Sequence, residues 1–474
     1  MDRKTKSYES EDGSPRRGSD PSNSAEDQAL VNLITQTAKK SSYNNSKKDL
    51  VKDEKPAPPP PKRSGCCGGV SDVVEPKPDE EERGVLKDPQ SSASYDVLGM
   101  VGEGGFSKVV LVRARAGHGA NGEVYAAKII PKAHLKSAGA SFVRATMLER
   151  NILGEFDHPL LLRLYHSFQE RDKLVLVVAY CPGGSLHTHV NISLKEDGRG
   201  FDEHRAAFYV AEIAQAIAHL HSHGIVHRDL KLENVLVHAS GHVAVSDFGA
   251  SKRLAPRPLK DCRAGNQDVP ERLPDKTRVA MGLRPVQTEP PAPLLTQTKS
   301  IVGTPAYMAP EMLLAQPYDF AVDWWALGVL FFTMLKGRLP FDAAEEDKML
   351  WRIVKSKPRY DPGWRKDTLE VLRALLQKRP ATRLCTLRDV GNMGLYKDYD
   401  WAKLERCELR PPFVPRLRND EDRTYVPRRV AAQEVPEKPL AYTKGDSMRK
   451  LFRKFSHRST VSRASTDDSS KGPN

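Results

Sequence analysis

The sequence has few aromatic residues, no signal-peptide core and no apolar run long enough to cross a membrane. Phe, Trp and Tyr make up 7% of the 474 residues. The chain shows neither zinc-finger spacing nor an RNA-binding aromatic motif, so we expect no nucleic-acid partner. The first residues, MDRKTKSYES, are polar. The longest apolar run, WWALGVLFFTML, is too short to span a bilayer and predicts a buried helix.

The six cysteines do not form an evident disulfide framework. Four of them stand apart, and Cys66 and Cys67 are adjacent, which disfavours a bridge between those two. This usage is typical of a reduced, intracellular protein, so we expect a cytoplasmic location. The adjacent pair, beside Lys62 and Arg63, is also a candidate for acylation, which would bring part of the protein to a membrane.

Basic residues outnumber acidic ones. The chain has 74 Lys and Arg against 61 Asp and Glu, a formal net charge of +13. This excess favours acidic partners such as nucleotide phosphates or acidic lipid. Hydrophobic residues make up 39% of the chain, which is enough for a sizeable core. The length suits about two or three domain-sized units.

Composition and periodicity divide the chain into an arm, two lobes and a tail. Residues 1–94 are rich in Ser, Lys, Asp, Glu and Pro, and we expect a disordered arm there. Residues 95–178 predict strands around one helix, and residues 179–396 predict mainly helices. Residues 397–474 form a Pro-containing tail with a basic, Ser-rich end. The predicted fold class is therefore α+β, with a small β-rich lobe followed by a larger helical lobe.

Polar motifs recur between the apolar segments in a fixed order. A Gly-rich turn, GEGGF, is followed by Lys128 in YAAK, Glu149 in LERNIL, HRDLKLEN, SDFG, GTPAYMAPE, DWWALGV and Arg383 in RPATRL. Each motif alone is weak, but the set in this order resembles the eukaryotic protein kinases over about residues 95–396. The resemblance implies a bilobal kinase fold, ATP and Mg²⁺.

The resemblance implies a role for each polar group, and phosphoryl transfer explains why such groups are needed. That reaction requires charge neutralisation and positioning more than covalent chemistry. Lys128 would neutralise the α- and β-phosphates, with Glu149 fixing its position. Asp229 would accept the proton of the attacking hydroxyl, and Lys231 would hold the γ-phosphate. The metal ligands would be Asn234 and Asp247, which offer the oxygen atoms that Mg²⁺ prefers.

Further positions follow from the same resemblance. Structural roles are expected for His227, which would pack against Phe248, and for Glu311, Asp323 and Arg383. The expected ATP-binding residues are Val101, Gly102, Glu103, Gly104, Gly105, Phe106, Ser107, Lys108, Val109, Ala126, Lys128, Glu149, Val178, Ala179 and Cys181.

Several segments resemble the AGC branch of these kinases, the group of the cyclic-nucleotide-dependent and ribosomal S6 kinases. They are ERNIL, YCPGGSL, VDWWALGVL and the tail DYDWAKLERCELRPPFVPRL, which in that branch wraps over both lobes with Pro412 and Phe413 as anchors. Lys231 and Thr304 imply serine/threonine specificity, with Thr304 contacting Asp229 and Lys231.

The sequence also departs from the branch. Ser107 replaces the third glycine of the loop, and Ala179 replaces an acid of the hinge. Ser185 and Thr333 replace acids that read Arg in a substrate, while Glu233 remains as a substrate-binding candidate. We therefore expect a weakened preference for basic residues before the target. About 254–295 of the activation segment is interpreted as an insertion, which costs little closure entropy.

Two segments are candidate switches. Arg228 would pair with a phosphate on Ser300, with Thr298 as a competing site, which implies an upstream activating kinase. In RKLFRKFSHR, residues 449–458, the pattern of Phe452, Phe455 and Ser456 resembles the hydrophobic motif that docks on the small lobe. The same residues could instead form a basic helical face for acidic membrane or calmodulin, or a disordered tail.

Protein substrates and a monomeric chain are expected. The main alternative function is a catalytically weak or inactive kinase-fold scaffold that binds a partner protein. Its support is Ser107 and the long insertion, while the intact base and metal positions speak against it. A basic nucleic-acid binder is a second alternative, and it predicts salt-sensitive binding to DNA or RNA.

Overall fold

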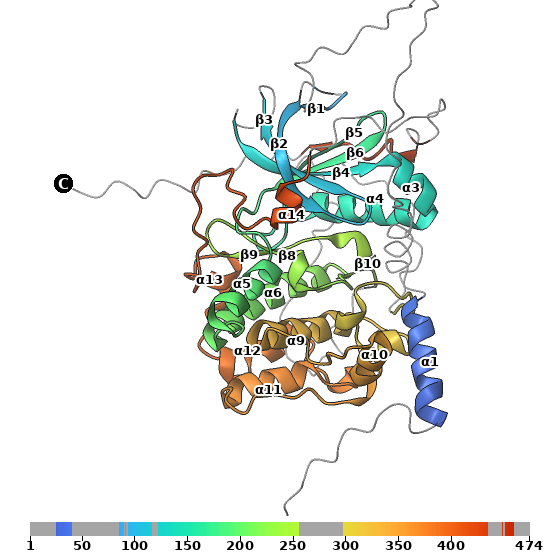
Figure 1. Ribbon diagram of the computed structural model, residues 1–474, viewed down its shortest axis with the longest axis vertical. Helices are drawn as coiled ribbons and strands as arrows, with labels where there is room; N and C mark the ends of the chain where they lie inside the picture. The colour runs from blue at the N-terminus through green and yellow to red at the C-terminus, as the bar shows by residue number, and fades with distance from the viewer. Residues whose placement is uncertain are drawn as a thin grey trace, which may run out of the picture.

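The chain folds into a small β-rich lobe stacked on a larger helical lobe (Figure 1). This computed structural model describes residues 25–39, 85–89, 91, 93–115, 122–255, 297–434, 448 and 451–458. The predicted α+β class is confirmed, with both lobes in the predicted order. The expected insertion at 254–295 lies almost wholly outside the described residues, as does the Cys66–Cys67 pair.

One antiparallel sheet of seven strands builds the small lobe. Its order is β1-β2-β3-β4-β6-β5-β11, and its alternating apolar residues, such as Val110 and Val112, lie buried on one face. Two helices cover the sheet: α3 (Lys132–Ala138) and α4 (Ala140–Glu155). The strands are β1 (Val85–Lys87), β2 (Ser94–Glu103), β3 (Lys108–Ala114), β4 (Val124–Pro131), β5 (Leu164–Gln169), β6 (Lys173–Ala179) and β11 (His457–Arg458).

Two long buried helices organise the large lobe. In α6 (Glu203–Ser222), Asp202 accepts a hydrogen bond from the Arg205 amide at 2.9 Å and caps the first turn. In α9 (Ala321–Lys336), every residue from 321 to 335 is buried, which agrees with the apolar run in its sequence. The remaining helices are α5 (Leu186–Asp197), α8 (Pro310–Leu313), α10 (Glu346–Lys355), α11 (Lys366–Leu375), α12 (Leu387–Gly391) and α13 (Trp401–Glu405).

Short strands and single 3₁₀ turns carry the polar motifs at the junction of the lobes. The strands pair as two small ladders, β7 with β10 and β8 with β9. The bounds are β7 (Ile225–Val226), β8 (Val235–Val237), β9 (Val243–Val245), β10 (Lys252–Arg253), η3 (Leu232–Asn234), η4 (Phe248–Ala250), η6 (Pro305–Tyr307), η7 (Pro380–Thr382) and η8 (Gly394–Tyr396).

The carboxy-terminal tail contacts both lobes. Figure 1 shows it rising from α13, beside the large lobe, to α14 (Arg428–Ala431) on the sheet. The Phe413 ring packs against His189 at 4.8 Å between centroids, and the Arg205 guanidinium lies 4.1 Å from its centroid. Pro412, the other expected anchor, is exposed. The Tyr180 hydroxyl donates a hydrogen bond to the Asp422 carbonyl at 2.6 Å.

The expectation of a disordered arm over residues 1–94 is wrong for two segments. Residues 25–39 form helix α1 (Ala25–Lys39), which packs beside α10, and β1 adds an edge strand to the sheet. The average composition of the arm concealed the helix, although Val31, Ile34 and Ala38 are spaced for one helical face and are buried. The described helices include none with the length and apolar content needed to cross a membrane.

Candidate active site

Lys128, Glu149 and Asp247 meet between the lobes. The Lys128 Nζ atom lies 2.5 Å from Glu149 Oε1 and 3.6 Å from Asp247 Oδ1. Strand β4 supplies the lysine, α4 supplies the glutamate, and Asp247 precedes η4. Burial alone would lower the pKa of Lys128, but the two carboxylates outweigh that effect and raise it. The ammonium is therefore charged at neutral pH and positioned to neutralise phosphate.

Asp229 lies at the centre of a second polar cluster. Its Oδ2 atom accepts a hydrogen bond from Lys231 Nζ at 2.7 Å, and its Oδ1 accepts one from the Thr304 hydroxyl at 2.8 Å. Lys231 Nζ also reaches Thr304 Oγ1 at 3.0 Å. Asn234 Nδ2 donates to the Asp229 carbonyl at 2.8 Å. These bonds fix the carboxylate of Asp229 in one orientation at the cleft.

Asn234 and Asp247 are suited to hold Mg²⁺. The Asn234 side chain uses its nitrogen to bind the Asp229 carbonyl, which directs its amide oxygen away from that bond. Although burial raises the pKa of Asp247, the nearby Lys128 and Lys231 hold it below its usual value, so the carboxylate is ionised. An amide oxygen and a carboxylate are hard oxygen donors of the type that this cation prefers.

Asp323 fixes the backbone of the loop that carries Asp229. Its carboxylate accepts hydrogen bonds from the amides of His227 and Arg228, each at 2.8 Å. The His227 ring is fully buried 5.3 Å from the ring of Phe248, as expected. Arg228 and Asp247 both have left-handed backbones, with φ of 69° and 62°. Strained conformations of this kind persist only where surrounding contacts enforce them, and they cluster at functional sites.

The Gly-rich turn between β2 and β3 closes over the cavity. The Gly104 amide bonds to the Ser107 carbonyl at 2.8 Å, and a Cβ at Gly104 would lie 2.9 Å from Ser107 Oγ. At its tip, the Phe106 ring contacts Phe142 of α4, with centroids 4.4 Å apart. The cavity beneath is about 360 Å³ and is lined by the turn, Lys128, Glu149, Asp229 and Asp247.

The expected ATP-binding residues divide into two groups. Gly104, Gly105, Phe106, Ser107, Lys128 and Glu149 line this cavity, whereas the expected adenine-side residues do not. The adenine-side residues lie on paired strands, where Ala126 is opposite Val178, and on the segment that leads to the large lobe. Those segments carry Ala126, Val178, Ala179 and Cys181, while β2 and β3 carry Val101, Gly102, Glu103, Lys108 and Val109.

Ser300 lies in a basic pocket. The Arg228 guanidinium donates to Ser300 Oγ at 2.6 Å, and Lys252 Nζ donates to Thr298 Oγ1 at 2.6 Å. Ser300 is exposed, whereas Thr298 is 5% exposed. Burial and the nearby Arg228 lower the pKa of Lys252. These two basic side chains bind the hydroxyls of Ser300 and Thr298. The sequence predicted the contact between Arg228 and Ser300. It did not predict that Lys252 would join them, because Lys252 belongs to no recognisable motif.

The aromatic pair near the carboxy terminus docks on the small lobe. Phe452 and Phe455 are fully buried, and β11 extends the sheet next to β5. The Phe455 carbonyl accepts bonds from Ser167 Oγ at 2.7 Å and Arg150 Nε at 2.8 Å. Three interpretations were given for this segment: a docked hydrophobic motif, a basic helical face and a disordered tail. The structure agrees with the docked motif, because both phenylalanines are buried. Ser456 Oγ is buried there and makes no hydrogen bond with the described residues.

The substrate and structural candidates occupy separate places. Glu233 is exposed, with His187 Nδ1 at 3.4 Å, and remains accessible to a substrate. Thr333 is buried and bonds to the Val329 carbonyl of its own helix at 2.7 Å. Glu311 and Arg383 form a buried bidentate pair with N–O distances of 2.6 and 3.0 Å. This pair joins α8 to the end of the large lobe.

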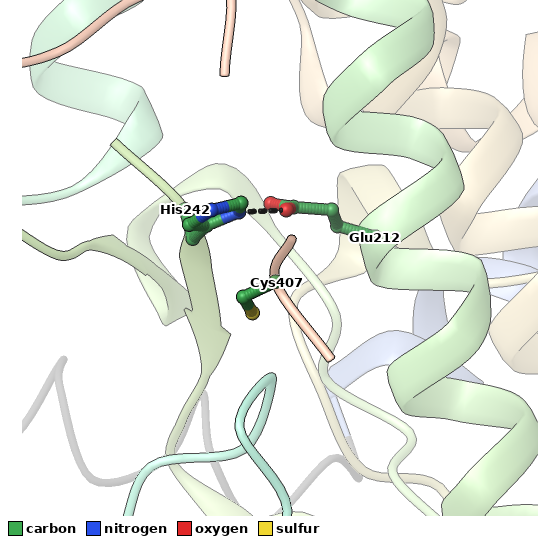
Figure 2. Close-up of side chains that lie close together, drawn as sticks. All are labelled: Glu212, His242 and Cys407. Atoms are coloured by element: carbon green, nitrogen blue, oxygen red, sulfur yellow. Dashed lines mark hydrogen bonds and ion pairs between the residues drawn. The ribbon is translucent and has the colours of Figure 1, made fainter. Parts of the chain in front are cut away.

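A second cluster has the residue types of a metal site. Figure 2 shows His242 pointing at Glu212 of α6, with the Cys407 side chain beside them. The Glu212 carboxylate already accepts from His242 Nδ1 at 2.5 Å and from the Val243 amide at 3.0 Å. Burial raises the pKa of the Cys407 thiol to about 12, so it is protonated at neutral pH. We assign this cluster to the attachment of the tail to α6.

The chain matches the protein kinase domain over residues 95–278 and 284–392. It is 34% identical to the protein kinase C eta type of Mus musculus over 335 residues, 69% of this chain and 42% of the relative. It is 32% identical to ribosomal protein S6 kinase alpha-1 of Rattus norvegicus over 366 residues, 76% of this chain and 43% of the relative. A RAC family serine/threonine-protein kinase homolog of Dictyostelium discoideum is also 32% identical, over 74% of this chain and 68% of the relative. The chain spans less than half the length of the first two.

Proposed function

This chain belongs to the protein kinase family, in its AGC branch, and from that premise we propose that it transfers the γ-phosphate of ATP to serine or threonine hydroxyls of proteins. The observation that carries the proposal is the arrangement around Asp229. Its carboxylate is held by Lys231 and Thr304, so it is oriented before a substrate arrives. A hydroxyl that donates to this carboxylate would lose its proton as the phosphorus–oxygen bond forms.

The residues around the cavity would supply positioning and charge neutralisation. Lys128, held by Glu149, would pair with the α- and β-phosphates, and Lys231 would neutralise the γ-phosphate as it moves. Asn234 and Asp247 would hold Mg²⁺, which when bound screens the negative charge of the phosphates. The Gly-rich turn would exclude water from the reacting groups, because its tip packs against α4 through Phe106 and Phe142.

We further propose that phosphorylation of Ser300 by an upstream kinase activates the chain. The serine hydroxyl already accepts a hydrogen bond from Arg228 at 2.6 Å, and Ser300 is exposed to a modifying enzyme. A phosphate would add about −1.5 to −2 charge, which Arg228 and Lys252 would neutralise. Because Arg228 adjoins Asp229, the new contacts would order the loop that carries the catalytic carboxylate.

The proposed substrate preference is basic but weak. Glu233 is the exposed carboxylate near the expected peptide site, whereas Ser185 caps helix α5 and Thr333 faces its own helix. One carboxylate in place of several leaves less Coulombic attraction for substrate arginines. A peptide array with arginine varied before the target serine would measure the preference, and we expect a small gain from arginine rather than a strict requirement.

A radiolabelled-phosphate transfer assay on the full chain tests the central proposal. Asp229→Asn should lower transfer to a serine peptide by about 10²–10⁴-fold, the usual contribution of a positioned base. The matched control is Asp361→Asn, the same carboxylate-to-amide change at an exposed side chain paired with Lys336. Equal transfer by Asp229→Asn and the control would refute the assignment. If both the unmutated chain and the Ser300→Glu variant bound nucleotide without transferring phosphate, that result would favour the scaffold alternative.

A further inference from the structure

Helix α1 buries one continuous stripe against the large lobe. Val31, Ile34, Thr35 and Ala38 recur at i, i+3, i+4 and i+7, and each is 8% exposed or less. Leu33, on the opposite face, is 48% exposed. Figure 1 shows α1 lying along the side of α10, at the edge of the large lobe. The helix therefore binds through a defined face rather than by loose association.

The surface under α1 is built by α10 and α8. Val31, Ile34 and Ala38 belong to the main core cluster of the molecule, together with Leu350 and Trp351 of α10. The Thr35 hydroxyl donates to Asp347 Oδ1, in the first turn of α10, at 2.9 Å. This apolar surface, with the Asp347 carboxylate at its edge, thus recognises a helix with two large apolar residues and one hydroxyl. We call it the α8–α10 surface.

The α8–α10 surface lies on the part of the large lobe that follows the catalytic segment. Helix α8 begins at Pro310, after Thr304 and the η6 turn. Thr304 contacts Asp229, and Glu311 of α8 is paired with Arg383. No residue of α1 is among those that line the cavity. A segment that binds as α1 does therefore adds no residue to the lining of this cavity.

We propose that the α8–α10 surface is a helix-docking site for protein partners, and that α1 of the same chain masks it. The partner would present an amphipathic helix with large apolar residues at i and i+3 and a hydroxyl or other donor at i+4. This inference goes beyond the proposed phosphoryl transfer and does not depend on it.

The energetics favour reversible masking. Burying Val31 and Ile34 stabilises the docked state, because their apolar surface leaves water. A 15-residue helix is only marginally stable alone in water, so the cost of ordering α1 on the α8–α10 surface offsets much of that gain. The docked and released states therefore differ by an amount that a competing helix can overcome.

A labelled peptide with the sequence of Ala25–Lys39 serves as the probe for the α8–α10 surface. It is titrated by fluorescence anisotropy into the full chain and into the full-length double variant Val31→Asp/Ile34→Asp, whose own α1 cannot dock. A tethered helix acts at an effective concentration on the order of 1 mM, so an intrinsic Kd of about 10 µM predicts roughly hundredfold tighter probe binding by the double variant. The matched control, Leu33→Asp, adds charge to the exposed face and should bind the probe as weakly as the unmutated chain.

Either of two results would overturn the proposal: equal probe affinity for the double variant and the unmutated chain, or no binding to either. A single cooperative thermal unfolding transition in every variant verifies that they are folded, and failure of peptide phosphorylation alone would concern only the proposed function. A dimer of the unmutated chain in light scattering that becomes monomeric in the double variant would place α1 on a second copy and refute masking within one chain.

Charge exchange gives a second, independent test. A probe carrying Thr35→Glu would set two carboxylates together at Asp347, and we expect at least tenfold weaker binding to the double variant. Adding Asp347→Lys to the protein should restore binding of this probe and weaken the original one. Identical affinities of both probes for both proteins would show that the peptide binds elsewhere.

Discussion

Replacement of Phe455 by alanine should release the carboxy-terminal segment from the small lobe. The ring is fully buried, and the backbone around it is anchored by Ser167 and Arg150. Truncating a buried phenylalanine costs about 3–5 kcal/mol. Here the loss falls on a short docked segment rather than on the whole domain, so it should appear as local undocking.

The lower end of that energy range gives the expected size of the effect. A loss of about 3 kcal/mol changes the ratio of docked to undocked segment by roughly a hundredfold. Arg453 and Lys454 lie inside the segment and are exposed, so trypsin can cut there once the backbone opens. Where opening is fast relative to cleavage, the cleavage rate follows the undocked population. We therefore expect Phe455→Ala to be cut at this site roughly a hundredfold faster than the unmutated chain.

Leu451→Ala is the matched control, because Leu451 is in the same segment but 54% exposed. Its cleavage rate should stay close to that of the unmutated chain. Undocking should also lower phosphoryl transfer, since Arg150 neighbours Glu149 on α4, and Glu149 holds Lys128. Equal cleavage of Phe455→Ala and Leu451→Ala would mean that the aromatic contact does not hold the segment, and the reasoning would be refuted.

Three further predictions concern stability. Glu311→Ala, which leaves the buried Arg383 unpaired, should lower the free energy of unfolding by about 3–5 kcal/mol in a denaturant titration, against little change for the exposed Glu345→Ala. Burial lowers the pKa of His189 from 6.5 to about 4, so stability should fall as pH drops from 6.5 towards 4, by about 1.4 kcal/mol per pH unit for this group. His189→Gln should flatten that slope, whereas His187→Gln should not. Gly241→Ala should destabilise the protein more than Gly198→Ala, because both backbones are left-handed but only a Cβ at Gly241 would meet the Phe413 carbonyl.

The main elements of the fold follow from local signals in the sequence. Alternating apolar residues predicted the strands of the small lobe, and the predicted helices of the large lobe include α6, where Phe208, Ile213 and Ile217 are buried. Asp202 is of a residue type that favours the start of a helix, and it accepts the capping hydrogen bond of α6. Gly224 is of the type that commonly follows a helix end, and it has φ of 72° two residues after the last helical residue. These signals succeed because caps and periodicity act within a few residues of the chain.

The sequence identified the side chains of the site but not the contacts made through backbone atoms. The motifs predicted Lys128, Glu149, Asp229, Asn234 and Asp247 as site residues, and the structure brings these residues together. Contacts to backbone atoms could not be predicted from the sequence. Ser167 and Gln169 donate hydrogen bonds to backbone carbonyls of the tail. Because every residue has the same carbonyl group, no pattern of residue types indicates such a contact.

Both terminal segments dock by the same physical means, on opposite lobes. Each buries two large apolar side chains, Val31 and Ile34 in α1 or Phe452 and Phe455 in the tail, and each adds hydrogen bonds at the edge. The sequence of each short segment predicts which of its side chains form an apolar face, but not which surface of the protein that face will contact. That surface is built by residues some hundreds of positions away in the chain. Each surface also lies on an element next to catalytic residues: α4 carries Glu149, and α8 follows Thr304. Segments that bind there can therefore alter the catalytic geometry through the helix they contact, without entering the nucleotide cavity.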